Sequence, residues 1–168
     1  MRRLLIISLA VTVAWASPAE AGFFSSTGPV IAIFAGKLFQ GEAEGNFDGS
    51  GTIMIQSNTK PDVTCSGQFT SSAELGGAGN LKCSDSSTST IKFQRLSIFR
   101  GYGTGSSSKG QMSFTYGLSA DESRPYLKMP PGKALMLDGK NLALVDVKKP
   151  LPARETGSET GASAQNNH

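Results

Sequence analysis

Short segments in which every second residue is apolar run through most of the chain. This two-residue period is typical of β-strands that place one face on a core and the other in solvent. Glycines and turn-forming residues separate the segments, so the pattern predicts short strands joined by hairpins. The expected strands are 30–34, 38–43, 51–56, 64–70, 79–83, 90–98 and 111–116.

One short helix is expected, near residues 120–126. Ser119 and Glu122 have the spacing of a capping box, in which each side chain bonds the other residue's backbone N–H. Pro125 prevents the helix from extending beyond about two turns.

The end of the chain predicts a final hairpin followed by a tail. Segments 133–137 and 142–147 flank an Asp-Gly-Lys-Asn sequence, in which Asp-Gly favours a tight turn. Residues 150–168 contain hardly any large apolar side chain. They cannot bury enough surface to offset the entropy of ordering, so a disordered tail is expected.

Glycine follows a weak repeat along the predicted strands. The phenylalanines Phe69, Phe93 and Phe114 come after glycine doublets at spacings of 24 and 21 residues. Each unit would be one hairpin, whose glycines permit a positive φ or a close backbone approach. A single hairpin cannot bury its apolar face, so several must roll up or stack into a small barrel or a sandwich. The doublets are Gly49/Gly51, Gly77/Gly79 and Gly101/Gly103.

The amino terminus has the three regions of a secretory signal peptide. Arg2 and Arg3 precede an apolar run over 4–15, which is too short to span a bilayer. Small residues at 19 and 21 predict cleavage after Ala21, with a cut after Ala16 as the alternative. We therefore expect an exported protein, periplasmic or extracellular, with no integral membrane span. Its single β domain would cover 22–149.

Composition adds two constraints. Of 168 residues, 20 are glycine and only 17% are charged, and the net charge is +3. Removal of 1–21 leaves fourteen basic and twelve acidic residues. A charge so close to zero gives no reason to expect a nucleic-acid partner. The two cysteines, Cys65 and Cys83, are expected to form a structural disulfide in an oxidising compartment.

The glycine motifs carry a resemblance. Phe39-x-Gly41, Gly49-x-Gly51, Cys65-x-Gly67-x-Phe69 and Gly77-x-Gly79 resemble membrane occupation and recognition nexus repeats, which form antiparallel hairpins. The chain also resembles an uncharacterised family of small exported bacterial proteins that shares Cys-Ser-Gly-x-Phe and Phe-Thr-Tyr-Gly-Leu-Ser. The likeness covers about 38–127 and implies a hairpin fold without implying an activity.

Little in the sequence predicts catalysis. The only histidine is His168, so no imidazole is available in the domain for a Ser/His/Asp or Cys/His arrangement. Glu42 and Glu44 share a strand face and are expected to protect an exposed edge strand. Asp48 is expected in a turn rather than in a calcium loop. We therefore expect no catalytic residues, no metal and no cofactor.

A binding surface is the remaining candidate site. The glycine-rich segment 101–109 lacks the context of a phosphate-binding loop and predicts a mobile hairpin loop. Tyr102 in this segment, with Arg95, Arg100 and Lys109 nearby, suggests a patch for a glycan, an anionic polymer or a protein. The alternative is an ordinary solubilised loop tip. The predicted function is a non-catalytic binding or structural module of the bacterial envelope, with an unidentified protein or envelope component as partner and an undetermined oligomeric state. The alternative is a secreted effector or inhibitor acting on another protein.

Overall fold

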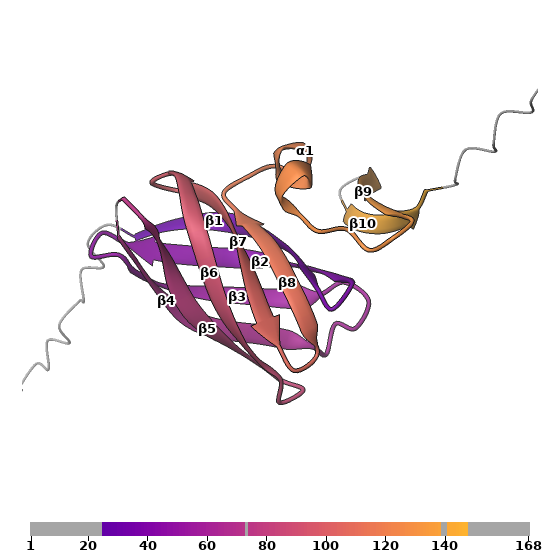
Figure 1. Cartoon of the computed structure of the whole chain (residues 1–168), viewed down its shortest axis with the longest axis horizontal. Helices are drawn as coiled ribbons and strands as arrows, with labels where there is room; N and C mark the ends of the chain where they lie inside the picture. Colours follow the sequence, from indigo (N-terminus) through magenta and orange to yellow (C-terminus); the bar gives the residue numbers. More distant parts are fainter. Residues whose placement is uncertain (1–24, 73, 139–140, 148–168) are drawn as a thin grey trace, which may run out of the picture.

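A closed antiparallel barrel dominates the computed structural model, which describes residues 25–72, 74–138 and 141–147 (Figure 1). Each barrel strand pairs with the next along the chain. The last strand then pairs with the first, from Val30 opposite Tyr116 to Phe34 opposite Met112. The strands are β1 (Ser25–Phe34), β2 (Lys37–Asn46), β3 (Ser50–Ser57), β4 (Thr64–Ser72), β5 (Gly76–Cys83), β6 (Thr88–Ser97), β7 (Arg100–Ser107) and β8 (Gly110–Tyr116).

This architecture confirms the all-β expectation and decides for the barrel over the sandwich. Closure also corrects the expectation that Glu42 and Glu44 protect an exposed edge strand, because a closed barrel has no edge strand. The strand β2, which carries Glu42 and Glu44, pairs with both β1 and β3. Both glutamates are exposed on the outer face. The expected signal peptide (1–21) and tail (150–168) lie outside the described residues.

The glycine-rich segment after residue 100 is a strand, which corrects the expectation of a mobile loop. Residues 100–107 form β7, which is paired along its length with β6 and β8. Its inward positions are Gly101, Gly103 and Gly105, and all three are buried. A pattern based on apolar side chains misses such a strand, because its backbone hydrogen bonds and the rings of neighbouring strands supply its stabilisation.

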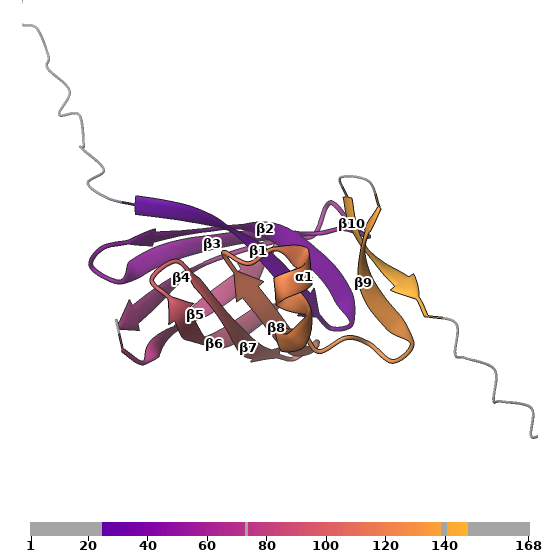
Figure 2. The same cartoon turned by 90° about the horizontal axis from the view of Figure 1, so that it is seen from above.

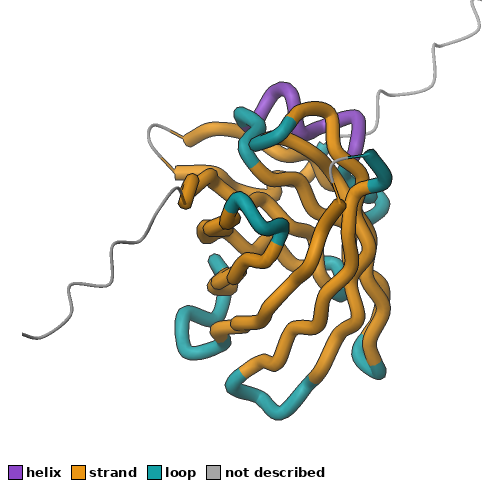
Figure 3. The backbone as a smooth tube through the Cα atoms, turned by 90° about the vertical axis from the view of Figure 1, so that its left-hand side faces the viewer, coloured by secondary structure: helices purple, strands orange, loops and turns teal. Residues whose placement is uncertain are grey.

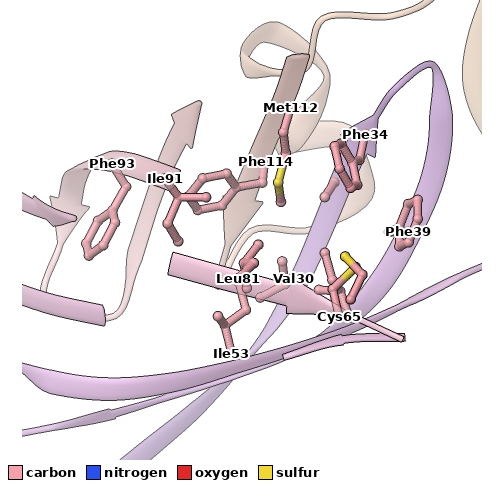
Figure 4. Close-up of a cluster of buried hydrophobic side chains, with 13 residues drawn as sticks. Val30, Phe34, Phe39, Ile53, Cys65, Leu81, Ile91, Phe93, Met112 and Phe114 are labelled. Carbon is pink, nitrogen blue, oxygen red and sulfur yellow. A yellow bond between two sulfur atoms is a disulfide. The ribbon is translucent and has the colours of Figure 1, made fainter. Parts of the chain in front are cut away.

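The barrel interior is fully packed at one end. Phe34, Phe39 and Met112 lie near this end together with the disulfide between Cys65 and Cys83, which confirms the predicted bond (Figure 4). The two cysteines are directly opposed on β4 and β5. In the chain-entropy model a loop of this length stabilises the fold by about 3 kcal/mol. This is the closed end of the barrel.

Aromatic rings cross over glycines on neighbouring strands, which gives the glycine repeat its structural meaning. Phe69 on β4 is opposite Gly51 on one side and Gly79 on the other. A Cβ added to Gly51 would overlap the Phe69 ring. The repeat therefore reflects close approach between ring and backbone. Gly49, which belongs to the first doublet, has a positive φ instead, as does Gly76, which precedes the second doublet.

The remaining elements pack on the outside of the barrel. The helix α1 (Ala120–Ser123) continues into the 3₁₀ turn η1 (Arg124–Tyr126), as the capping box predicted. The expected hairpin follows as β9 (Lys133–Asp138) and β10 (Asn141–Asp146), beside α1 in Figure 2. Apolar side chains from these elements meet the outer face of β1 and β2. This outer cluster comprises Ile31, Ile33, Leu38, Leu127, Leu135 and Leu142.

Candidate functional site: a pocket in the open end of the barrel

The end of the barrel opposite the disulfide is hollow. A pocket of about 440 Å³ lies between the ends of β2, β4, β6 and β8 and the beginnings of β1 and β3. We call it the barrel-mouth pocket. Figure 3 looks toward this end of the molecule, where the strands curve around the interior. The volume is within the range of about 300–1,000 Å³ that is usual for small-molecule sites.

Small residues at inward positions create the hollow. At the closed end the corresponding positions carry Phe34, Phe39 and Met112, whereas the pocket is bounded by Gly28, Gly45 and similar small residues. An eight-stranded barrel has an interior that side chains can just fill. Replacing large side chains by glycine and serine at one end therefore leaves space for a ligand.

An aromatic wall bounds one side of the pocket. The rings of Phe69 and Phe93 meet edge to face with centroids 5.5 Å apart, and Phe93 also packs edge to face against Phe114 at 6.5 Å and Tyr116 at 5.6 Å. All four residues line the pocket. Edge-to-face packing holds the rings in place, so this wall is rigid and largely apolar.

Arg95 is a charged side chain in the pocket lining. Its guanidinium Nη2 donates to Ser71 Oγ over 2.7 Å, and Ser71 Oγ donates to the carbonyl of Gly49. This chain of bonds connects the end of β6 to β4 and to the turn between β2 and β3. Arg95 forms no ion pair among the described residues. Its charge therefore remains available to a ligand.

The Tyr116 hydroxyl is buried near Arg95, and its proton has no acceptor in the described part of the chain. The hydroxyl lies over Gly101 on β7, where no side chain intervenes. Burial raises the pKa of Tyr116, and the charge of the nearby Arg95 acts in the opposite direction. The phenol therefore stays protonated at neutral pH and can donate a hydrogen bond.

An apolar rim surrounds part of the opening, formed by Phe47, Ile98 and Phe99. Phe47 is 72% exposed in the turn between β2 and β3, and Ile98 and Phe99 are 57% and 51% exposed between β6 and β7. All three also line the pocket. Among the described residues, the carboxylate in the lining is that of Asp48, in the turn predicted for it. Its pKa is lowered because the side chain and backbone of Ser50 both donate to it.

The four residues proposed as a surface patch are not gathered at one place. Arg95 faces the pocket. Tyr102 lies outside on β7, where it stacks on Tyr126 and donates to Gln94. Arg100, also outside, pairs with Glu122. Lys109 is at the closed end, where its Nζ lies 2.6 Å from a carboxylate oxygen of Asp85.

Sequence reasoning missed Tyr116 and the aromatic wall, although a signal was present. Arg95 is two and four residues from the inward-facing Phe93 and Ile91, and Tyr116 is two residues from Phe114. The strand period therefore places both polar groups on the inner face. Because residues two and four apart on a strand share a face, Arg95 belongs to the inner face and not to an outer patch.

No group of three or more His, Cys, Asp or Glu side chains suited to a metal ion occurs within 25–72, 74–138 and 141–147. In the same ranges, no helix is long and apolar enough to cross a membrane. No protein-family model, no curated protein and no solved structure matches this chain.

Proposed function

We propose that this protein is an exported, non-catalytic binding module of the bacterial envelope, and that it binds a small apolar molecule in the barrel-mouth pocket. The observation that carries the proposal is the pocket itself, about 440 Å³ in volume and lined by Phe69, Phe93, Phe114 and Ile53. Apolar, preformed hollows with a few polar groups are typical of ligand sites in barrels.

The contrast between the two ends of the barrel supports this proposal. The closed end is packed and held by the Cys65–Cys83 disulfide, whereas the open end is hollow. A packed interior contributes more stability than a hollow one. An apolar hollow retained in a small barrel is therefore better explained by an occupant than by folding.

Export and location in the envelope are proposed from the sequence of residues 1–21. The disulfide and the lack of a membrane-spanning helix among the described residues are compatible with this proposal. The disulfide is expected to persist only in an oxidising compartment.

The proposal is tested with N-phenyl-1-naphthylamine, a neutral dye that fluoresces in apolar surroundings, added to the oxidised protein. Gly45 lines the pocket, and a Cβ there would meet nothing closer than Phe69 Cζ at 3.9 Å. A Gly45→Leu variant should therefore fold and fill the pocket, and lower dye affinity by about tenfold or more. Glu44→Leu is the matched control, because its side chain is on the outer face of the same strand.

Saturable one-to-one binding that Gly45→Leu weakens and Glu44→Leu preserves is the expected result. Equal affinities in the two variants would place the dye outside the barrel and refute the proposal. Circular dichroism and urea unfolding of both variants check that the barrel is intact.

A further inference from the structure

The barrel-mouth pocket has an apolar depth and a polar entrance. Ile91 and Phe93 on β6 are followed by Arg95 nearer the strand end, and Phe114 on β8 is followed by Tyr116. Ile53 closes the apolar part from β3. A molecule that matches this lining has an apolar body and one polar end.

The polar end of that molecule must complement a positive charge. Arg95 has five N–H donors, and its hydrogen bond to Ser71 uses one of its nitrogens. No carboxylate pairs with it among the described residues. Asp48, the carboxylate in the lining, already accepts hydrogen bonds from Ser50. An anionic group of a ligand would provide the missing partner for the guanidinium.

The Tyr116 hydroxyl also favours a ligand with an anionic group. A buried hydroxyl whose proton has no acceptor is destabilising, and such groups in native proteins usually have an explanation. Because the phenol is protonated at neutral pH, what it lacks is an acceptor. An anion held by Arg95 at the same end of the pocket would also accept from Tyr116.

A carboxylate suits this pair better than a phosphate monoester. One guanidinium neutralises one negative charge, and its planar fork matches the two oxygens of a carboxylate. A phosphate monoester carries about −1.5 to −2 charges at neutral pH and would keep an unbalanced charge near the apolar wall. The pocket therefore favours a monoanion.

We propose that the ligand of the barrel-mouth pocket is a small amphiphilic monocarboxylate, bound with its apolar chain between Ile53, Ile91 and the aromatic wall and its carboxylate on Arg95 and Tyr116. This inference rests on the proposed function and adds the chemical class of the ligand.

The test is displacement of N-phenyl-1-naphthylamine from the oxidised protein by decanoate, 1-decanol and decyl phosphate at neutral pH. These competitors share one apolar chain and differ in the polar end. Decanoate should compete about tenfold more strongly than decanol, because hydrogen bonds to a charged group are worth more than those to a neutral one. It should also compete more strongly than decyl phosphate.

Two variants with matched controls locate the carboxylate. Arg95→Met should abolish the preference for decanoate over decanol, and Tyr116→Phe should reduce it by about threefold, since it removes one hydrogen bond. Arg100→Met and Tyr102→Phe should leave the preference unchanged, because both residues lie on the outer face. All four variants should still bind the neutral dye, which shows that the pocket is intact.

The outcomes separate this inference from the proposed function. Dye binding with equal competition by decanol and decanoate would overturn the carboxylate assignment and leave the binding pocket standing. So would stronger competition by decyl phosphate, or a preference for decanoate that survives Arg95→Met. Absence of dye binding to the unmodified protein would overturn both proposals.

Discussion

Replacing Gly103 by alanine should destabilise the barrel, whereas replacing Gly45 by alanine should not. Both glycines face the interior, on β7 and β2. A Cβ on Gly103 would lie 2.6 Å from Phe114 Cζ and 2.7 Å from Cε1, and closer still to the backbone oxygen of Lys92. A Cβ on Gly45 would meet only Phe69 Cζ, at 3.9 Å.

The magnitudes follow from these distances. Ordinary contacts of a Cβ begin at about 3.4 Å, so the Gly103→Ala methyl requires the ring or the strand to move by more than 0.5 Å. Overpacking of this kind costs about 1–3 kcal/mol. Alanine in a strand otherwise gains about 0.5–1 kcal/mol over glycine. Because this gain is common to both variants, it cancels, and they should differ in free energy of unfolding by roughly 1–3 kcal/mol.

Urea unfolding followed by circular dichroism measures this difference, provided that the denaturant dependence is the same in both variants. A double-mutant cycle separates the contribution of the Phe114 ring from that of the Lys92 backbone oxygen. Adding Phe114→Leu to Gly103→Ala should recover part of the loss, because it removes the ring but leaves the Lys92 oxygen in place. If Gly103→Ala were as stable as Gly45→Ala, the close approach of ring and glycine would not be the reason for the glycine repeat.

Two further predictions concern the disulfide and the capped helix α1. Replacing both Cys65 and Cys83 by alanine should lower the free energy of unfolding by about 3 kcal/mol; a free-thiol assay that finds two thiols in the purified protein would contradict the disulfide. The pKa of Glu122 is lowered from 4.5 to about 2, first by the hydrogen bond from the Ser119 backbone and then by Arg100. A lowered folded-state pKa stabilises the fold above pH 4.5, and this contribution is lost as the pH falls toward 2. The difference in melting temperature between the natural protein and Glu122→Gln should therefore shrink over that range, and a constant difference would refute the assignment.

Local pattern was sufficient for most of the strands and for the short helix. Alternation around Ile53 and Ile91 predicted their strands, and the Ser119–Glu122 spacing predicted the capped helix. The pattern failed at β7, because Gly101 and Gly103 carry no apolar side chain to reveal the buried face. It also failed at the outer cluster, since nothing local indicates that Leu135 and Leu142 pack on β1 and β2.

The site was the least predictable part. The basic residues around 95–109 suggested an external patch because they are close in sequence, yet the two faces of a strand separate neighbours. Arg95 faces inward, and Arg100 begins the next strand on the outer face. Distance along the chain was therefore a poor guide to distance in space.

The sequence by itself determined the strand period, the capped helix, the glycine repeat and the cysteine pair. Each of these depends on residues that are close in sequence, within one hairpin or one helical turn, where spacing and turn chemistry act directly. Only the tertiary structure decided that β8 pairs with β1 and that one end of the resulting barrel is hollow. Closure joins Val30 to Tyr116 across the length of the domain. Arg95 and Tyr116 are already neighbours across β7, because both are opposite Gly101. The pairing of β8 with β1 encloses the space in front of them, because it brings β1 and β2 around to form the rest of the pocket lining.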